Sequence, residues 1–151
     1  MSKMAAFLWF DGQAEQAATF YASTFPDSRI TSPQRSGDGP ATSVSLVICG
    51  REFVAFNGGP HFKFTEAISF QIVTDDQAET DRLWSAITSD GGTESRCGWC
   101  KDRWGLSWQI VPRALMKALS SDDRAAAGRA TKAMMTMKKI DVAAIETAFA
   151  G

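Results

Sequence analysis

The chain has 151 residues, the length of one ordinary domain, and 44% of them are hydrophobic and 22% charged. Sixteen Lys and Arg against seventeen Asp and Glu give a net charge of −1. We therefore expect no nucleic-acid partner, which would require a basic excess. No apolar run approaches the roughly 20 residues that cross a bilayer, and the first residues lack the apolar core of a signal peptide. These features predict a cytoplasmic protein with no membrane partner.

The chain uses one sequence pattern twice. After a shift of 64 positions, six of the fifteen residues from 10 to 24 are identical to those from 74 to 88. Each copy begins with a short apolar strand, and an Asp that suits the start of a helix follows it. A helix with apolar residues at spacings of three and four comes next, and further strands follow. The repeat therefore predicts two βαβββ units in tandem.

The predicted elements can be placed along the chain in order. In the first unit they are a strand at 5–10, a helix that ends at Phe25-Pro26, and strands at 28–32, 42–49 and 52–57. In the second unit they are a strand at 67–74, a helix that ends at Asp90-Gly91-Gly92, and strands at 93–99, 101–104 and 106–111. From Arg113 onward we expect helices, one from Ser121 or Asp122 to about Met137 and a short one from Asp141 to Phe149.

Strand alternation assigns side chains to the two faces of each sheet. Phe7 and Trp9 share the face opposite the helix, and a shift of 64 residues places Ser69 and Gln71 on the corresponding face of the second unit. Gln71 and Gln109 are amides within mainly apolar strands. Such residues lie either on a solvated face, the usual case for an antiparallel sheet, or in a lined cavity. There they could bind a ligand, or each other and water.

Histidine and cysteine counts limit the chemistry. The single histidine, His61, excludes sites built from several histidines of one chain. The three cysteines, Cys49, Cys97 and Cys100, argue against a disulfide framework because their number is odd and no export signal accompanies them. The CxxC at 97–100 is not followed by a predicted helix, as a redox motif would be, and has no second pair for zinc. We expect a structural strand end there and keep Cys100 as a candidate reactive thiol, because two basic residues follow it closely.

Several segments carry a family resemblance. Residues 8–17 (LWFDGQAEQA), 57–60 (NGGP) and 107–112 (SWQIVP) resemble the PhnB-like proteins, which carry the label 3-demethylubiquinone-9 3-methyltransferase. Those proteins belong to the glyoxalase, bleomycin-resistance and extradiol-dioxygenase group, the vicinal oxygen chelate superfamily. The resemblance covers nearly the whole chain. It implies an α+β fold in which tandem βαβββ modules form a curved mixed sheet around a cup. It also implies one domain over 1–151, with modules at 1–60 and 61–112 and a helical C-terminal extension at 113–151.

The resemblance also bears on metal binding. In the wider superfamily, four cup positions hold a divalent metal through His, Glu or Gln, and the metal stabilises charge as a Lewis acid. Carried over to this chain, the four positions fall near Ala5, near Asn57, at Ser69 and at Gln109. Only Gln109 has a side chain of the ligating kind, and one amide oxygen gives little divalent affinity. We therefore expect no catalytic metal and no cofactor.

For function, the resemblance favours binding of a small apolar or aromatic molecule in the cup without a metal. The candidate lining residues are Phe7, Trp9, Asn57, Ser69, Gln71, Trp99, Trp104 and Gln109. Two alternatives stay open: an enzyme of unassigned reaction that uses Gln109, Gln71 or Cys100, and a dimeric scaffold with no ligand. The methyltransferase label finds no support in the sequence, because no Gly-rich nucleotide loop follows the first strand. The resemblance also implies a homodimer, in which two copies can exchange modules.

Overall fold

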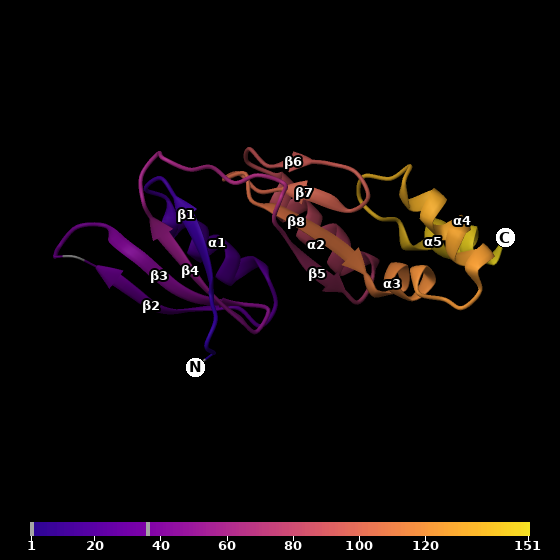
Figure 1. The fold of residues 1–151 in the computed structure, drawn as a ribbon, viewed down its shortest axis with the longest axis horizontal. Helices are drawn as coiled ribbons and strands as arrows, with labels where there is room; N and C mark the ends of the chain where they lie inside the picture. Colours follow the sequence, from indigo (N-terminus) through magenta and orange to yellow (C-terminus); the bar gives the residue numbers. More distant parts are fainter. Residues whose placement is uncertain (1, 36) are drawn as a thin grey trace. The chain divides into compact units, whose positions relative to one another are not determined.

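The structure, a computed structural model, describes residues 2–35 and 37–151 and divides into two compact units, residues 1–64 and 65–151 (Figure 1). The first unit contains β1 (Ala6–Phe10), α1 (Ala14–Thr24), β2 (Arg29–Arg35), β3 (Ala41–Ile48) and β4 (Arg51–Asn57). The second unit contains β5 (Ser69–Thr74), α2 (Gln77–Thr88), β6 (Thr93–Glu94), β7 (Trp99–Lys101), β8 (Ser107–Pro112), α3 (Arg113–Leu119), α4 (Arg124–Met134) and α5 (Val142–Ala150). Among the described residues, no helix is both long enough and apolar enough to span a membrane.

The two sheets have one topology. Their strand orders are β1-β4-β3-β2 and β5-β8-β7-β6. In each sheet the first strand lies at an edge and pairs in parallel with the last strand of its unit, and the remaining pairs are antiparallel. The mixed α+β fold with tandem βαβββ units and C-terminal helices is thereby confirmed.

In the first unit, α1 covers one face of the sheet and leaves the other face open. Leu8 and Phe10 point toward the helix and are each 3% exposed, whereas Phe7, which precedes Leu8, is 66% exposed. The helix side that meets the sheet is rich in alanine, with Ala14, Ala17 and Ala18 fully buried. Small side chains allow the helix to approach the strands closely. The predicted alternation in the first strand is therefore confirmed.

Helices α1 and α2 have different N-caps. Asp76 caps α2, accepting a hydrogen bond from Glu79 N at 2.8 Å, while Glu79 Oε2 accepts one from Asp75 N at 2.7 Å. This arrangement resembles a capping box built from local sequence, except that Glu79 accepts from the residue before the cap. At the start of α1 the cap residue Gln13 makes no side-chain cap hydrogen bond. Instead Asn57 Oδ1, from the end of β4, accepts the hydrogen bond of Ala14 N, because the first copy has Gly12 at the position equivalent to Asp76.

The CxxC segment differs from the predicted strands. β6 ends at Glu94 and β7 spans Trp99–Lys101, so the predicted strands at 93–99 and 101–104 have wrong bounds. Cys97 and Gly98 turn the chain between β6 and β7 with left-handed φ angles of 57° and 83°. Their backbone N–H groups donate to Met137 O and Lys138 O at 2.9 and 2.8 Å. The segment that follows α4 therefore holds this turn in place.

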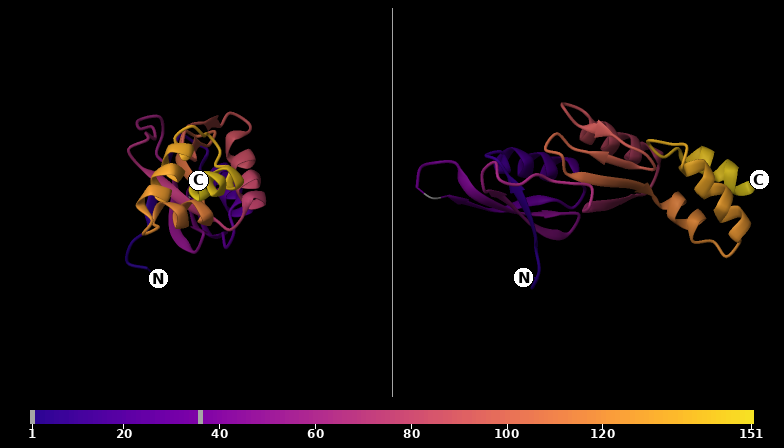
Figure 2. Two further views of the ribbon diagram at one scale, coloured as in Figure 1. Left: turned by 90° about the vertical axis from the view of Figure 1, so that its right-hand side faces the viewer. Right: turned by 45° about the horizontal axis from the view of Figure 1, so that its top comes forward.

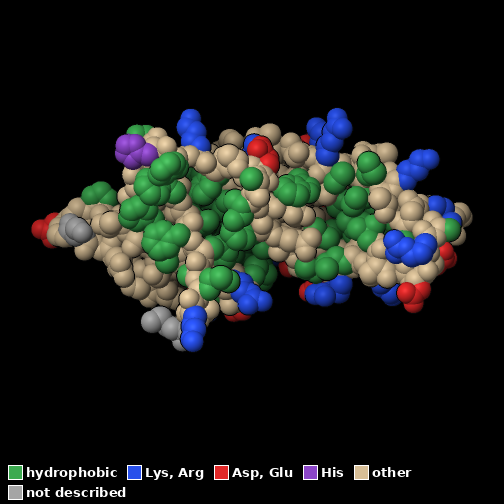
Figure 3. All heavy atoms as spheres, viewed as in Figure 1, with side chains coloured by type: hydrophobic (Ala, Val, Ile, Leu, Met, Phe, Trp, Pro, Cys, Tyr) green, Lys and Arg blue, Asp and Glu red, His purple; other side chains and the backbone are tan. Residues whose placement is uncertain are grey.

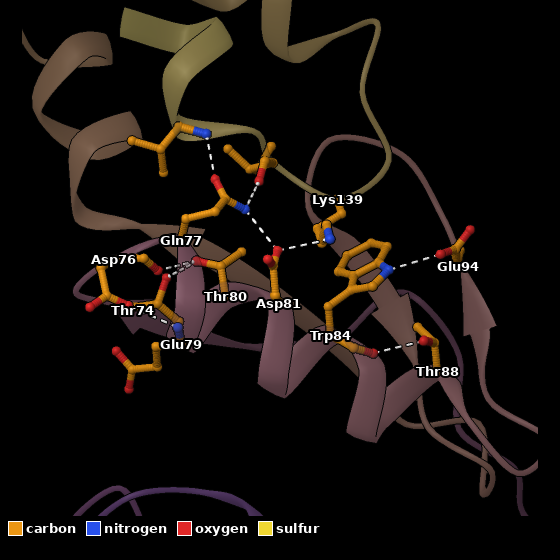
Figure 4. A network of polar contacts seen from close by, with 12 residues as sticks. Thr74, Asp76, Gln77, Glu79, Thr80, Asp81, Trp84, Thr88, Glu94 and Lys139 are labelled. Atoms are coloured by element: carbon orange, nitrogen blue, oxygen red, sulfur yellow. Dashed lines mark hydrogen bonds and ion pairs between the residues drawn. The ribbon is translucent and has the colours of Figure 1, made fainter.

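The C-terminal helices pack on one another and dock on α2. They follow β8 and lie side by side, as the right-hand view of Figure 2 shows. Gln77 at the start of α2 donates to Ile140 O at 3.0 Å and accepts from Val142 N at 2.7 Å (Figure 4). Its amide also donates to Asp81, which pairs with Lys139 at 2.8 Å. One glutamine thus satisfies backbone groups at the start of α5, where a helix leaves N–H groups unpaired.

Candidate functional site

The open face of the first unit carries a cluster of aromatic rings. Phe7 and Trp9 come from β1 and Phe56 comes from β4, in which Trp9 and Phe56 are paired in register. The centroid of Phe56 lies 5.7 Å from that of Phe7 and 5.2 Å from that of Trp9. Phe62, from the segment after β4, meets Trp9 edge to face at 4.9 Å. Phe7 and Phe62 are each 66% exposed, and Figure 3 shows hydrophobic side chains gathered over this unit.

The NGGP turn fixes the Trp9 indole. Trp9 Nε1 donates a hydrogen bond to Gly59 O at 2.8 Å. The ring lies directly against Gly58, where a Cβ would come within 2.2 Å of Trp9 Cζ2. No side chain larger than hydrogen fits at that position while the indole stays in place. Because its only hydrogen-bond donor is used within the chain, Trp9 offers a ligand a ring surface and no polar group.

The open face of the second unit is polar. Gln71 on β5 lies opposite Gln109 on β8, and Gln109 also lies opposite Trp99 on β7. Gln109 Nε2 donates to Ser69 Oγ at 2.9 Å. Among the described residues, neither the Gln109 carbonyl oxygen nor the Gln71 amide has a hydrogen-bond partner. The structure thus brings four of the predicted residues, Ser69, Gln71, Trp99 and Gln109, onto one face.

A small cavity of about 160 Å³ lies beside these residues, lined by Trp99, Lys101, Ser107 and Glu66 among others. Lys101 pairs with Glu66 at its edge, and this hydrogen bond lowers the pKa of the Glu66 carboxyl. Ser107 is 1% exposed, and its hydroxyl has no hydrogen-bond partner among the described residues. An unsatisfied buried hydroxyl is unusual in a folded chain, so this polar cavity has unused hydrogen-bonding capacity.

Two of the predicted lining residues lie elsewhere. Asn57 points to the helix side of its sheet, where its Oδ1 accepts from Ala14 N and its Nδ2 donates to Ala41 O, both at 2.9 Å. The tertiary cap of α1 therefore occupies this side chain, contrary to the expected position in the cup. Trp104 lies in the turn between β7 and β8, with the Arg103 guanidinium 5.1 Å from its ring. It belongs to no strand, so strand alternation does not apply to it.

Sequence reasoning missed three residues of the aromatic face. Phe56 could have been found from alternation in the strand at 52–57, because it falls on the face opposite the buried Phe53 and Ala55. Gly58 belongs to the NGGP motif, which marks it as a turn residue, but the motif does not indicate that it contacts the Trp9 ring. Phe62 follows the strand in an irregular segment, and no periodicity places it against Trp9.

Cys100 lies within β7 and is 1% exposed. Burial, together with the nearby charges of Asp102 and Glu94, raises the pKa of its thiol to about 12. The basic residues that follow Cys100 were expected to favour its thiolate. The raised pKa has the opposite effect, so Cys100 stays protonated near neutral pH. A protonated, buried thiol is a poor nucleophile.

Asp102 organises the turn after β7. It is 2% exposed, and its Oδ1 accepts from the backbone N–H groups of Trp104 and Leu106 at 2.9 and 3.1 Å. Its Oδ2 accepts from Trp108 Nε1 at 2.9 Å. This carboxylate joins the turn to the buried Trp108 ring and so sets where β8 begins, which positions Gln109.

The residues at the superfamily's metal positions do not fit a divalent ion. Ala5 has no ligating atom, both polar atoms of the Asn57 amide are bonded on the helix side, and Ser69 accepts from Gln109. The described residues also contain no group of three or more His, Cys, Asp or Glu arranged to hold a metal. A divalent ion needs several oxygen or nitrogen ligands that converge, which these positions do not supply.

Two βαβββ units, each with a helix on one face of its sheet and the other face open, define the glyoxalase and bleomycin-resistance class of fold. The PhnB protein from Bacillus cereus is 28% identical, with a TM-score of 0.67, covering 74% of this chain and 99% of that one. A glyoxalase/bleomycin resistance protein from Albidiferax ferrireducens is 12% identical, with a TM-score of 0.52 and coverages of 74% and 99%. The fosfomycin resistance protein FosX from Mesorhizobium loti is 13% identical, with a TM-score of 0.53 and coverages of 74% and 92%. The last two show the fold alone.

The sequence model of one family, described as 3-demethylubiquinone-9 3-methyltransferase, matches residues 2–111. The chain belongs to this family, whose label the PhnB protein from Bacillus cereus shares, and this confirms the resemblance drawn from its motifs. No curated protein matches the chain.

Proposed function

We propose that the chain binds a small apolar or aromatic molecule on the open aromatic face of its first unit, without a catalytic metal. The observation that carries this proposal is the ring cluster of Phe7, Trp9, Phe56 and Phe62. Phe7 and Phe62 are both two-thirds exposed. Full burial of an aromatic side chain stabilises by about 1.5–3 kcal/mol. Covering both therefore offers a ligand about 2–4 kcal/mol.

The rigidity of the cluster supports a binding role over loose exposure. Trp9 is held by Gly58, by the hydrogen bond to Gly59 and by edge-to-face contacts with two phenylalanines. A ring that is already ordered loses little conformational entropy when a ligand covers it. With the indole N–H in use, recognition on this face relies on ring stacking and apolar contact.

The amides of the second unit favour a ligand that also carries hydrogen-bonding groups. Gln71 and the carbonyl of Gln109 retain free donors and acceptors on the open face of that sheet. Such groups fix orientation in ligand sites that are otherwise apolar. That the open faces enclose one cup remains a prediction from the family resemblance. We assign no methyl transfer, since neither sheet has the doubly wound topology of nucleotide-binding domains.

The test uses 2-naphthol as an aromatic probe, with binding measured as the rise in melting temperature of the full chain. We expect a dose-dependent rise that Phe7→Ala and Phe62→Ala each reduce by at least half. Met135→Ala is the matched control, because Met135 is 65% exposed in the second unit, and it should leave the rise unchanged. No rise with the probe, or equal rises in all variants, contradicts the proposed site.

The metal part of the proposal has its own test. We expect Zn²⁺, Mn²⁺ and EDTA to leave both the melting temperature and the response to 2-naphthol unchanged. A stoichiometric ion that Gln109→Ala releases would contradict it. Turnover of a probe would favour the enzyme alternative, and a stable dimer that binds no probe would favour the scaffold.

We further propose that the chain forms a homodimer. The edge strands β1 and β5 contain neither proline nor a charged residue, whereas the edge strand β2 contains Pro33 and two arginines. Proline and charge protect a sheet edge from pairing, and edges without them are open to it. Light scattering should give a mass of two chains at micromolar concentration. A monomer at all concentrations tested contradicts the dimer.

A further inference from the structure

The three C-terminal helices form a cleft of their own. They follow the part of the chain that the family match covers, which ends at residue 111. Their core contains Leu115, Ile140 and Ile145, all 2% exposed or less. Beside this core, α3, the α3–α4 turn and α5 line a cleft of about 480 Å³. That volume lies within the roughly 300–1,000 Å³ typical of small-molecule sites.

The floor and one wall of this cleft are apolar. Ala114 and Ala118 stand one turn apart on α3, and their small side chains leave the space open. Phe149 of α5 lines the cleft and also packs against the helical core. The end of α5 is fixed by Arg129, which donates to Ala148 O at 3.0 Å and to Phe149 O at 2.7 Å. The backbone of Phe149 is therefore fixed by the neighbouring helix.

Charges of both signs line the same cleft. Lys117 comes from α3, Asp122 from the α3–α4 turn and Glu146 from α5. Within the described part of the chain, none of the three has an ion-pair partner, although Lys138 and Lys139 of the same unit are paired. A cation and two carboxylates around an apolar floor are the complement of a molecule with an apolar body and two opposite charges.

We propose that this cleft is a second binding site, for a small zwitterion with an apolar body and about the size of a dipeptide. Lys117 binds the carboxylate of the ligand, and Glu146 with Asp122 binds its ammonium group. The apolar body covers Ala114, Ala118 and Phe149. Charge-assisted hydrogen bonds are stronger than neutral ones, so both ends of the ligand contribute to affinity. This site is independent of the aromatic face and does not rest on the proposed function above.

The experiment is calorimetric titration of the full chain with leucyl-leucine and its blocked forms. The free dipeptide carries both charges, the N-acetyl form only the carboxylate, the C-terminal amide only the ammonium, and the doubly blocked form neither. We expect the free dipeptide to bind best, each single block to weaken binding about three- to tenfold, and the double block to abolish it.

Variants of the cleft residues test which side chain binds which charged group of the dipeptide. Lys117→Met should weaken the free dipeptide about three- to tenfold but leave the affinity of the amide form unchanged, and Glu146→Gln should do the converse with the N-acetyl form. Ala114→Leu should fill the cleft and remove binding. Lys132→Met is the matched control, because Lys132 lies in the last turn of α4 as Lys117 lies in the last turn of α3, and it lies outside the cleft.

Three outcomes would overturn the proposal. The first is no binding of any form at millimolar concentration while circular dichroism shows a folded chain. The second is equal affinity for the free and doubly blocked dipeptides, which would remove the role of the charges. The third is a dimer that Ala114→Leu converts to a monomer, which would make the cleft a contact between copies of the chain.

Discussion

Replacing Gly58 by Ala should destabilise the first unit through a clash with Trp9. The new Cβ would lie 2.2–2.5 Å from three atoms of the indole, so the ring must move. Moving it breaks the hydrogen bond to Gly59, worth about 0.5–1.5 kcal/mol. It also breaks two edge-to-face ring contacts, each worth about 0.5–1.5 kcal/mol.

An opposing effect reduces this cost. The φ angle of Gly58 is not in the left-handed region, so alanine fits the backbone there. Alanine also lowers the conformational entropy of the unfolded chain, which stabilises the folded chain by about 0.4–1 kcal/mol. We therefore expect Gly58→Ala to lower the free energy of unfolding by about 1–4 kcal/mol. Urea titration followed by circular dichroism measures this change.

Two comparisons make the prediction specific. Gly128→Ala in α4 has no atom within 4 Å of the new Cβ, so it should stabilise the chain by up to about 1 kcal/mol. In a Trp9→Leu background, Gly58→Ala should stabilise the chain slightly, because the clashing ring is gone and only the effect on the unfolded chain is left. A cost for Gly58→Ala that persists in that background would refute the reasoning. So would a change no different from that of Gly128→Ala.

Four further changes test other contacts. Gln77→Ala should lower the free energy of unfolding by about 1–3 kcal/mol and speed proteolysis after residue 139, and unchanged cleavage would contradict its docking role. The hydrogen bonds from Lys139 and Gln77 lower the pKa of Asp81, so its stabilisation is present above its unfolded pKa and is lost as pH falls through the folded value. Asp81→Asn should therefore flatten the acid side of the stability profile between about pH 5 and pH 2, and an unaltered profile would argue against this pair. Asp102→Ala should cost about 3–5 kcal/mol and Asp102→Asn clearly less, because only the first leaves every donor unpaired; equal losses in urea titrations would be inconsistent with this. With its pKa raised to about 12, Cys100 should resist iodoacetamide at pH 8 until urea unfolds the chain, and mass spectrometry showing fast alkylation of the folded chain would exclude the buried thiol.

The sequence by itself determined the repeated unit and the faces of its strands. Period-two alternation is a property of the extended backbone, so the placement of Phe7 and Trp9 opposite the buried Leu8 followed from their order alone. The cap of α2 was equally local, because Asp76 and Glu79 lie within one turn of each other. The family motifs were readable for the same reason, since each is a short contiguous run.

Only the tertiary structure decided which residues meet across the chain. Asn57 caps a helix that begins 43 residues earlier, and Gln77 binds backbone 63 and 65 residues away. Neither bond leaves a periodic trace in the sequence. The contact between Gly58 and the Trp9 ring, the burial that raises the pKa of Cys100, and the cleft beside α3 and α5 likewise arise from packing. Packing joins residues by their position in space, and residue order along the chain does not encode that position directly.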